Sequence, residues 1–133
     1  MFPASTKMGG MCFGFPDVCK TPTPAGPVPL PYPNTAQCPM AQGVSVIVKI
    51  LNQPVLTKMS QIPLSNGDEA GSAGGVISGV VMGPAAYKQG ISKVKVEGND
   101  IVTVTMPTGQ NGTNPNVPGA QIAPSQTLVI VIP

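Results

Sequence analysis

Apolar residues in this chain recur at every second position or in short continuous runs, and glycine or proline interrupts almost every run. Alternation of this kind is typical of a half-buried β-strand, because successive side chains of a strand point to opposite faces of the sheet. A long helix would instead need apolar residues repeating on one helical face without such interruptions. The pattern therefore predicts an all-β fold of short strands and hairpins.

Two hairpins give the clearest signal. In each of them, a run that alternates in valine and isoleucine is followed by residues that favour a turn and then by a second run. Glycine and asparagine at such turns tolerate the positive φ that tight hairpins require. The predicted strand pairs are 43–51 with 54–60 across the turn 51–54, and 91–97 with 101–106 across the turn 98–100.

The segments between and after these hairpins are rich in glycine and uncharged polar residues, so their predicted elements are less regular. They are, in chain order, a polar loop over 65–75, a strand over 76–82, a helical turn over 83–90, a long loop over 107–119 and a last strand over 127–132, which Pro133 follows directly. A loop as long as 107–119 in a small domain is usually functional or mobile.

Proline dominates the N-terminal part, with seven prolines between Phe15 and Asn34. Each proline restricts φ and removes a backbone donor, and it pushes the preceding residue toward extended geometry. We therefore predict a stiff, extended ribbon that can be neither a helix nor a central strand. Large apolar side chains recur within it at Val28, Leu30 and Tyr32, which predicts that the ribbon packs onto the body of the protein.

Length and composition indicate one compact domain. The chain has 133 residues, of which 41% are hydrophobic, and it contains 16 Gly and 17 Pro. A second core would leave each half too small to bury enough surface, and the many helix breakers agree with a β fold rich in turns. The domain 1–133 is predicted to consist of a Pro/Gly-rich extended segment over 1–42 and of β-hairpins and loops over 43–133.

Charged residues are sparse, and their kind argues against a nucleic-acid partner. They make up 9% of the chain with a net charge of +2, and arginine, the side chain best suited to clamp phosphates, is absent. Lys93 and Lys95 lie at alternate positions of a predicted strand, where a solvated face explains them better than a phosphate track. We therefore expect no nucleic acid among the partners.

The sequence contains no recognisable signal peptide or membrane-spanning segment. The first residues lack the basic start and the continuous apolar stretch of a signal peptide, and the longest apolar runs have only the length of a strand. We therefore expect a protein that is made in the cytoplasm, where its three cysteines stay reduced.

Several stretches of the sequence resemble PAAR-like proteins of contractile injection systems. They are Phe15-Pro-Asp-Val-Cys-Lys-Thr-Pro, continued by Gly26-Pro-Val-Pro-Leu-Pro-Tyr-Pro-Asn34, and Gly67-Asp-Glu-Ala-Gly-Ser-Ala-Gly-Gly75. The segment Val94-Lys-Val-Glu-Gly-Asn-Asp-Ile-Val102 is similar to the strand–turn–strand segment of the family, and 103–111 continues the similarity. Together these pieces cover roughly residues 10–111.

This resemblance implies a cone-shaped, pseudo-threefold β fold, similar to a β-helix, with long Pro/Gly-rich loops. It implies a structural protein that caps the distal end of a trimeric VgrG-type spike, at one copy per trimer, in a type VI secretion system or a related particle. Such a tip sharpens the spike for membrane puncture, contacts the target membrane transiently and helps to load secreted effectors. It would be exported on firing, and it would act by shape alone, so we expect no enzymatic activity.

The same resemblance raises the question of a metal ion. PAAR-like proteins with a metal site hold zinc near the tip with histidines and a cysteine, whereas this chain contains no histidine. Gln110 stands in the neighbourhood where a histidine would be sought, so a histidine-type zinc site is excluded. The cysteines Cys12, Cys19 and Cys38 have spacings of seven and nineteen, unlike the paired Cys-x-x-Cys motifs of structural zinc sites.

Two interpretations of the cysteines stay open. With Asp17, a water or a backbone group as the fourth ligand, the three thiolates would form a tetrahedral site, so a small metal-binding β domain is the alternative function. Buried free thiols are the favoured interpretation, because free cysteine commonly packs as a small hydrophobe. Three methionines, Met8, Met11 and Met40, flank the cysteines. Their thioethers could bind copper(I), but the favoured interpretation is that they fill gaps in the core. We expect no cofactor and assign no metal ligands.

No combination of residues indicates catalysis. Without histidine, the candidates for a general base are the five carboxylates Asp17, Asp68, Glu69, Glu97 and Asp100. Asp68 and Glu69 are adjacent in a Gly-rich loop, where side chains of an extended chain point apart, and a turn or N-cap role for Asp68 is favoured. The glycines of 67–75 lack the Gly-Lys-Ser/Thr ending of a phosphate-binding loop, so close backbone packing explains them better. A hydrolase ranks third among the functions considered.

Overall fold

The computed structural model describes residues 2–132, and the all-β prediction is confirmed. The strands are β1 (Phe2–Pro3), β2 (Met11–Thr21), β3 (Val28–Gln37), β4 (Lys49–Ile50), β5 (Gln53–Pro54), β6 (Gln61–Ile62), β7 (Ala85–Tyr87), β8 (Ile91–Val96), β9 (Asn99–Ile101), β10 (Pro107–Gln110), β11 (Val117–Ala123) and β12 (Ile130–Val131). One short 3-10 helix, η1 (Cys38–Met40), follows β3. No helix within residues 2–132 is long and apolar enough to cross a lipid bilayer.

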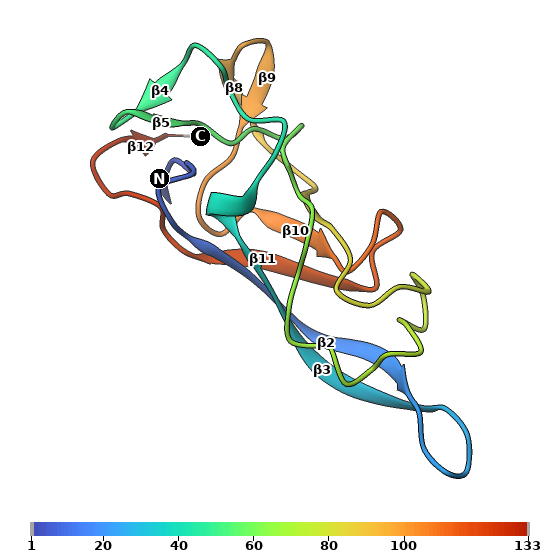
Figure 1. Cartoon of the computed structure of the whole chain (residues 1–133). Coiled ribbons are helices and arrows are strands. Elements are labelled where there is room, and N and C mark those ends of the chain that lie inside the picture. The colour runs from blue at the N-terminus through green and yellow to red at the C-terminus, as the bar shows by residue number, and fades with distance from the viewer. Residues whose placement is uncertain (1, 133) are drawn as a thin grey trace.

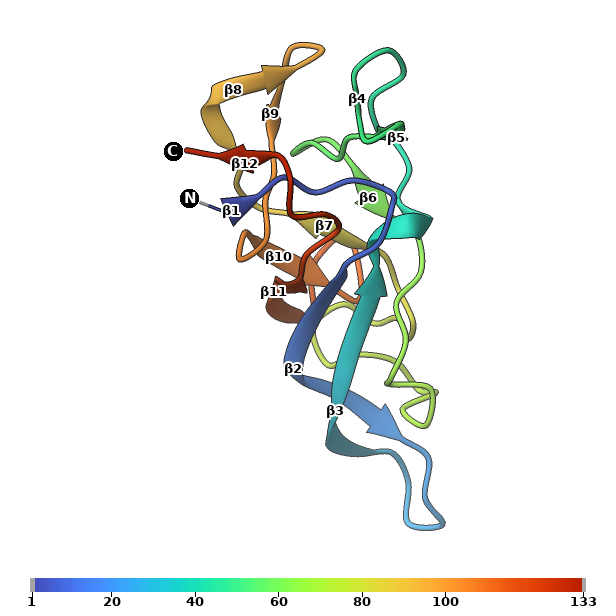
Figure 2. The same cartoon turned by 90° about the vertical axis from the view of Figure 1, so that its left-hand side faces the viewer.

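An antiparallel sheet of six strands, in the order β3-β2-β11-β10-β7-β6, forms the centre of the molecule. Three further sheets have two strands each and pair β1 with β12, β4 with β5, and β8 with β9. Figures 1 and 2 show these small sheets and both chain termini gathered at one end, whereas the long β2–β3 hairpin extends to the opposite end. We call the first the wide end and the second the narrow end, because the fold tapers between them.

The narrow end consists of the distal part of the β2–β3 hairpin and two loops that pack beside it. The loop 65–83 is joined to β2 by backbone hydrogen bonds from Lys20 N to Gly74 O, at 2.8 Å, and from Val76 N to Val18 O, at 3.0 Å. The loop 111–116, between β10 and β11, lies against the same strand through Asn116 Nδ2, which donates to Val18 O at 2.9 Å. Three segments far apart in the sequence therefore meet at this end.

The apolar core has two parts. The larger cluster lies against the central sheet and contains buried residues from several strands, namely Cys12, Ala36, Cys38, Ala41, Leu56, Ile62, Ala85, Tyr87 and Val102. The second cluster underlies the small sheets of the wide end and contains Ala4, Val55, Ile91, Val96, Ile101 and Val131. The narrow end belongs to neither cluster, so other interactions must hold it together.

The Pro-rich ribbon is a β-hairpin, and the prediction that it contains no central strand is wrong. β2 lies between β3 and β11 although it carries Pro16, because its pairing with β3 shifts register between Gly14 and Asp17 and a proline is tolerated at such an irregularity. β3, which holds the alternating prolines, is an edge strand and can lack donors on its outer side.

The prediction that the large side chains of the ribbon pack onto the body holds for only part of it. Val28 and Leu30 are each 40% exposed to solvent. Tyr32 is half-buried, and its hydroxyl lies 2.5 Å from Thr21 Oγ1 across the hairpin. The hairpin extends beyond the two apolar clusters, and its outermost apolar residues belong to neither.

Both predicted hairpins form, and both are shorter than predicted. Of the return strand predicted over 101–106, only Ile101 belongs to β9 (Asn99–Ile101). β8 occupies most of 91–97, but the turn is Glu97–Gly98, one residue earlier than predicted, with positive φ of 51° and 86°. Of the strands predicted over 43–51 and 54–60, only β4 and β5 form, across Leu51 and Asn52. Two consecutive residues with positive φ make the twisted turns that suit hairpins.

The less regular segments were predicted poorly. Residues 76–82 form turns and bends instead of a strand, the helical turn predicted over 83–90 contains β7, and the loop predicted over 107–119 contains β10 and the start of β11. The last strand shrinks to β12, and Pro133 lies outside the described residues. Pairing between strands distant in sequence, such as β7 with β10, decides which of these segments become strands, and local propensity does not show it.

Substitution of one glycine can test how closely the loop 65–83 packs against the β2–β3 hairpin. Gly67 has φ of +115°, and a Cβ added to it would lie 2.4 Å from Pro33 O. We predict that Gly67→Ala lowers the free energy of unfolding, measured by urea denaturation, by about 2 to 4 kcal/mol, since it combines backbone strain with overpacking.

Gly26→Ala is the matched control, because Gly26 has a similar φ of +110° and nothing within 4 Å of an added Cβ. We expect it to cost only the backbone term, about 1 to 2 kcal/mol. Equal losses for the two variants would show that the approach of Gly67 to Pro33 is unimportant.

Candidate functional site

A buried carboxylate lies at the centre of the narrow end. Asp17 is inaccessible to solvent and follows the register shift in β2. Its carboxylate accepts hydrogen bonds from the side-chain amides of three asparagines, namely Asn34 at 3.2 Å, Asn111 at 3.1 Å, and Asn116. Hydrogen bonds to an ionised group are stronger than those between neutral groups, so this carboxylate links β2, β3 and the loop 111–116.

The backbone fixes the direction of two of these amides. Gly83 N donates to Asn111 Oδ1 at 2.8 Å, and Ile77 N donates to Asn116 Oδ1 at 2.8 Å. With each oxygen satisfied by a backbone N–H, the NH₂ group must face the opposite way, toward Asp17. The same contacts attach the loop 65–83, because both donors belong to it.

A thiol and a second carboxylate complete the cluster. Cys19 Sγ lies 3.5 Å from Asp17 Oδ1 and 3.7 Å from Asp68 Oδ2. Asp68 is also inaccessible to solvent, and its carboxylate accepts the backbone N–H of Met82 at 3.2 Å. One ligand-type atom from each of Asp17, Cys19 and Asp68 lies within 4.8 Å of the others. We call these three residues and the three asparagines the Asp17 cluster.

Burial changes the acidity of two members of this cluster. Desolvation, together with the neighbouring Asp17, raises the pKa of Asp68 to about 7. Desolvation, followed by the charges of Asp17 and Asp68, raises the pKa of Cys19 to about 12. The thiol is therefore neutral near pH 7 and lacks the thiolate that a nucleophile needs.

The structure does not bring the three cysteines together, so the predicted three-cysteine site does not form. Cys12 and Cys38 lie around Tyr87, whose hydroxyl oxygen is 3.7 Å and 3.6 Å from their sulfur atoms. Cys12 and Cys19 lie seven residues apart on one extended strand, a separation of about 20 Å at the usual rise of a strand.

All three cysteines are buried and form no disulfide bond, and their burial agrees with packing as small hydrophobes. Hydrogen bonding to Cys38 and desolvation raise the pKa of Cys12, which keeps that thiol neutral. The methionines that flank the cysteines were expected to fill gaps in the core, but Met8 and Met40 are 47% and 40% exposed, and only Met11 is half-buried. Met8 and Met40 therefore neither fill the core nor join a buried soft-metal site.

The Asp17 cluster does not fit the zinc that the family resemblance raises. A tetrahedral zinc needs four lone pairs directed at the ion. Asp17, Cys19 and Asp68 supply three potential ligand atoms, but Asn111 and Asn116 direct NH₂ groups at the same space, and their oxygens are held by backbone donors. These hydrogens repel a cation. Gln110 is fully buried, and its side-chain amide lies 3.0 Å from Thr108 Oγ1.

The sequence pointed to only part of this cluster. Asp17 and Cys19 were considered as possible ligands, but Asp68 was assigned a turn role. Asp68 does accept a turn bond, from Gly71 N to its backbone oxygen at 2.9 Å, while its side chain reaches the cluster. Glu69 points elsewhere, as predicted, and accepts Gly67 N at 3.0 Å. The asparagines were missed, since Asn111 and Asn116 are uncharged loop residues without a periodic signal and Asn34 lies within the proline-rich strand β3.

Comparison with known proteins supports the PAAR-like resemblance. The sequence model of a family described as "Toxin PAAR-like domain" matches residues 10–117. A protein of Pseudomonas aeruginosa named "DNase toxin Tse7" is 34% identical over 95 residues, which cover 66% of this chain and 25% of that protein. The chain therefore spans about a quarter of the length of this curated relative. No solved structure matches the chain.

These findings correct two expectations. The expectation that the protein is not an enzyme is contradicted, because the relative is named a DNase toxin and the family is described as a toxin domain. The same name conflicts with the expectation of no nucleic-acid partner. Both expectations rested on the missing histidine and arginine of this chain, which spans only a quarter of the relative. The findings support the type VI secretion and effector context that the resemblance implied.

The Asp17 cluster generates a stability prediction. We expect Asp17→Asn to lower the free energy of unfolding by about 3 kcal/mol, because charge-assisted bonds are lost and amide N–H groups then face an amide. Urea denaturation followed by circular dichroism measures the change.

Asp100→Asn is the control, since it removes a carboxylate whose ion pair with Lys95 lies at the surface. We expect it to cost less than about 1 kcal/mol. A wild-type stability for Asp17→Asn would rule out a central role for this carboxylate.

Proposed function

The chain belongs to the toxin PAAR-like domain family, and we propose that it caps the distal end of a trimeric VgrG-type spike in a type VI secretion system. One copy sits on each trimer, with the wide end on the spike and the narrow end forward. The protein is made in the cytoplasm, assembles at the spike tip with its toxin cargo and leaves the cell on firing. It touches the target membrane only during puncture.

Exposed apolar side chains at the wide end carry this proposal. Ile47 is 85% exposed and Val46 is 78% exposed, in the segment before β4. Further large apolar residues are exposed in the two terminal segments, namely Phe2, Leu128, Val129, Ile130 and Ile132. Figure 2 places the β4–β5 hairpin and both terminal strands at the same end of the molecule. Exposed apolar residues gathered in this way are typical of a protein–protein interface.

The apolar segment before β4 is held in place without a partner. Glu97, at the β8–β9 turn, accepts the backbone N–H groups of Val46, Ile47 and Val48 at 2.9, 3.1 and 3.2 Å. These bonds lower the pKa of Glu97, with Val48 N–H the largest contribution. A segment that is already ordered loses less conformational entropy on binding, so this arrangement favours docking through the exposed side chain of Ile47.

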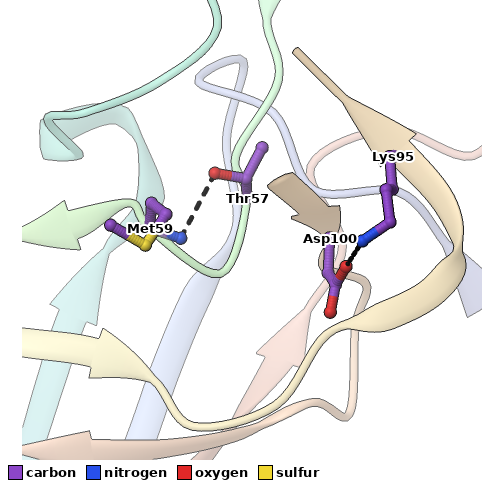
Figure 3. Close-up of polar contacts among 4 residues, drawn as sticks. All are labelled: Thr57, Met59, Lys95 and Asp100. Carbon is purple, nitrogen blue, oxygen red and sulfur yellow. Dashed lines mark hydrogen bonds and ion pairs between the residues drawn. The ribbon is translucent and has the colours of Figure 1, made fainter. Parts of the chain in front are cut away.

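Polar contacts border this apolar surface. Figure 3 shows Lys95 and Asp100, from β8 and β9, whose ion pair spans 2.8 Å, and the nearby turn in which Met59 N donates to Thr57 Oγ1 at 3.3 Å. The turn is joined to β9 because Lys58 N donates to Asp100 O at 2.8 Å. An apolar centre with a polar rim is the usual composition of an interface.

The edges of the wide end suit a β-helical partner. β1 and β12 form a two-stranded sheet. Val104 N donates to Pro3 O at 3.1 Å on the outer side of β1, whereas β12 has an edge that no strand of the described residues covers. The end of a trimeric β-helix also has unpaired backbone groups and exposed apolar rungs, which a cap must cover. Docking of the wide end therefore covers incomplete edges on both partners.

Substitution of one residue at each end tests the docking surface. We predict that Ile47→Asp weakens binding to the cognate VgrG-type trimer at least about tenfold, because it places a charge in an apolar contact. Co-purification and light scattering measure binding and the ratio of one chain to three.

Ile77→Asp is the matched control, because Ile77 is 63% exposed but lies in the loop 65–83 at the narrow end. We expect it to bind as the wild type does. Unimpaired binding by Ile47→Asp, or equal losses for both variants, would contradict docking through the wide end.

A second candidate function is nuclease toxicity, which is favoured by the name of the relative. We propose that the protein takes part in the delivery or the action of a DNA-cleaving toxin. If the activity lies in this segment, purified chain incubated with supercoiled plasmid and Mg²⁺ will produce nicked or linear DNA, and removal of Mg²⁺ will stop the reaction. Plasmid that stays supercoiled at stoichiometric protein would exclude nuclease activity in this segment.

A further inference from the structure

The narrow end buries two carboxylates without a basic partner. Asp17 and Asp68 are both inaccessible to solvent, and the one ion pair found within residues 2–132 joins Lys95 to Asp100 elsewhere. Two ionised carboxylates this close, in a poorly solvated site, repel each other and lose their hydration. Either a cation or a proton must therefore neutralise one of the two charges.

The donors around the cluster show which carboxylate keeps its charge. Asp17 accepts three side-chain amides and faces the Cys19 thiol. Asp68 accepts one backbone N–H, from Met82, and the same Cys19 thiol at a longer distance. Hydrogen bonds to the charged form favour that form, so the negative charge belongs on Asp17.

The same donors oppose a cation. The oxygens of Asn111 and Asn116 are engaged by backbone N–H groups, so their NH₂ groups face Asp17 and cannot turn without losing those bonds. A cation placed among the ligand-type atoms of Asp17, Cys19 and Asp68 would lie beside these hydrogens. A proton on Asp68 needs no such space.

We propose that a proton, and not a metal ion, neutralises one of the two buried carboxylates of the narrow end. Asp17 is then ionised and Asp68 is protonated within a metal-free cluster. Desolvation and the neighbouring Asp17 support this assignment, since they raise the pKa of Asp68 to about 7. The other titratable groups facing Asp68 are Asp17 and Cys19, both on β2. The assignment concerns only the narrow end, so it stands or falls independently of the proposed docking on a spike.

A definite dependence of stability on pH follows. In the unfolded chain Asp68 releases its proton near pH 4, whereas in the folded chain it keeps the proton until about pH 7. Between these values the folded state binds more protons than the unfolded state, so stability falls as the pH rises. One retained proton corresponds to about a tenfold decrease in the folding equilibrium constant for each pH unit within that window.

Two measurements on the purified chain test the proposal. Elemental analysis of protein prepared without chelator should find metal far below one equivalent, and EDTA should leave the melting temperature unchanged. In Asp68→Asn, which cannot titrate, the decrease in stability with rising pH should be lost, whereas Glu69→Gln, at the exposed neighbouring carboxylate, should keep it. Comparison of these two variants isolates Asp68 from the other carboxylates.

A third measurement needs no variant and covers the case in which Asp68→Asn does not fold. The side-chain carboxyl ¹³C signals of aspartate in the wild-type protein should include one that titrates near pH 7. A stoichiometric metal whose removal lowers the melting temperature would overturn the proposal. So would aspartate signals that all titrate at ordinary acidic values.

Discussion

The buried charge of Asp17 is the interaction on which the narrow end depends. Both apolar clusters lie elsewhere, so the β2–β3 hairpin and the loops 65–83 and 111–116 have no common hydrophobic core to join them. The carboxylate provides the joint, because amides from β3 and from the loop 111–116 converge on it, and the oxygens of two of those amides bind the backbone of the loop 65–83. An ionised carboxylate has two acceptor oxygens, and each hydrogen bond to it is stronger than one to a neutral amide.

The two ends of the molecule use opposite chemistry, and this division supports the proposed role. At the narrow end the buried carboxylate and amide groups satisfy one another, although apolar residues such as Ile77 are exposed there too. At the wide end a carboxylate again organises backbone N–H groups, but there Glu97 holds exposed apolar residues such as Ile47 outside the core. This distribution suits the proposed cap, whose narrow end must be rigid and whose wide end must bind the spike.

The sequence predicted the class of the fold more fully than its pairing. Alternation and turn residues located the β8–β9 hairpin, since its signal is local. They missed β10 and β11, because Thr108 pairs with Gly119 and Tyr87 in a segment with low strand propensity. The cluster was hidden for a related reason, since Asp17 and Asn116 are 99 residues apart and neither position stands out in the sequence.

Prolines and the Asp17 cluster act on different sides of the folding equilibrium. The prolines of β3 limit the freedom of the unfolded chain and occupy an edge where a missing N–H costs little. The cluster acts in the folded state, where the loss of one carboxylate would leave several amide groups without an acceptor. A narrow extension with little apolar core is stabilised by both effects, so the proline-rich composition that predicted a stiff ribbon also suits a rigid tip.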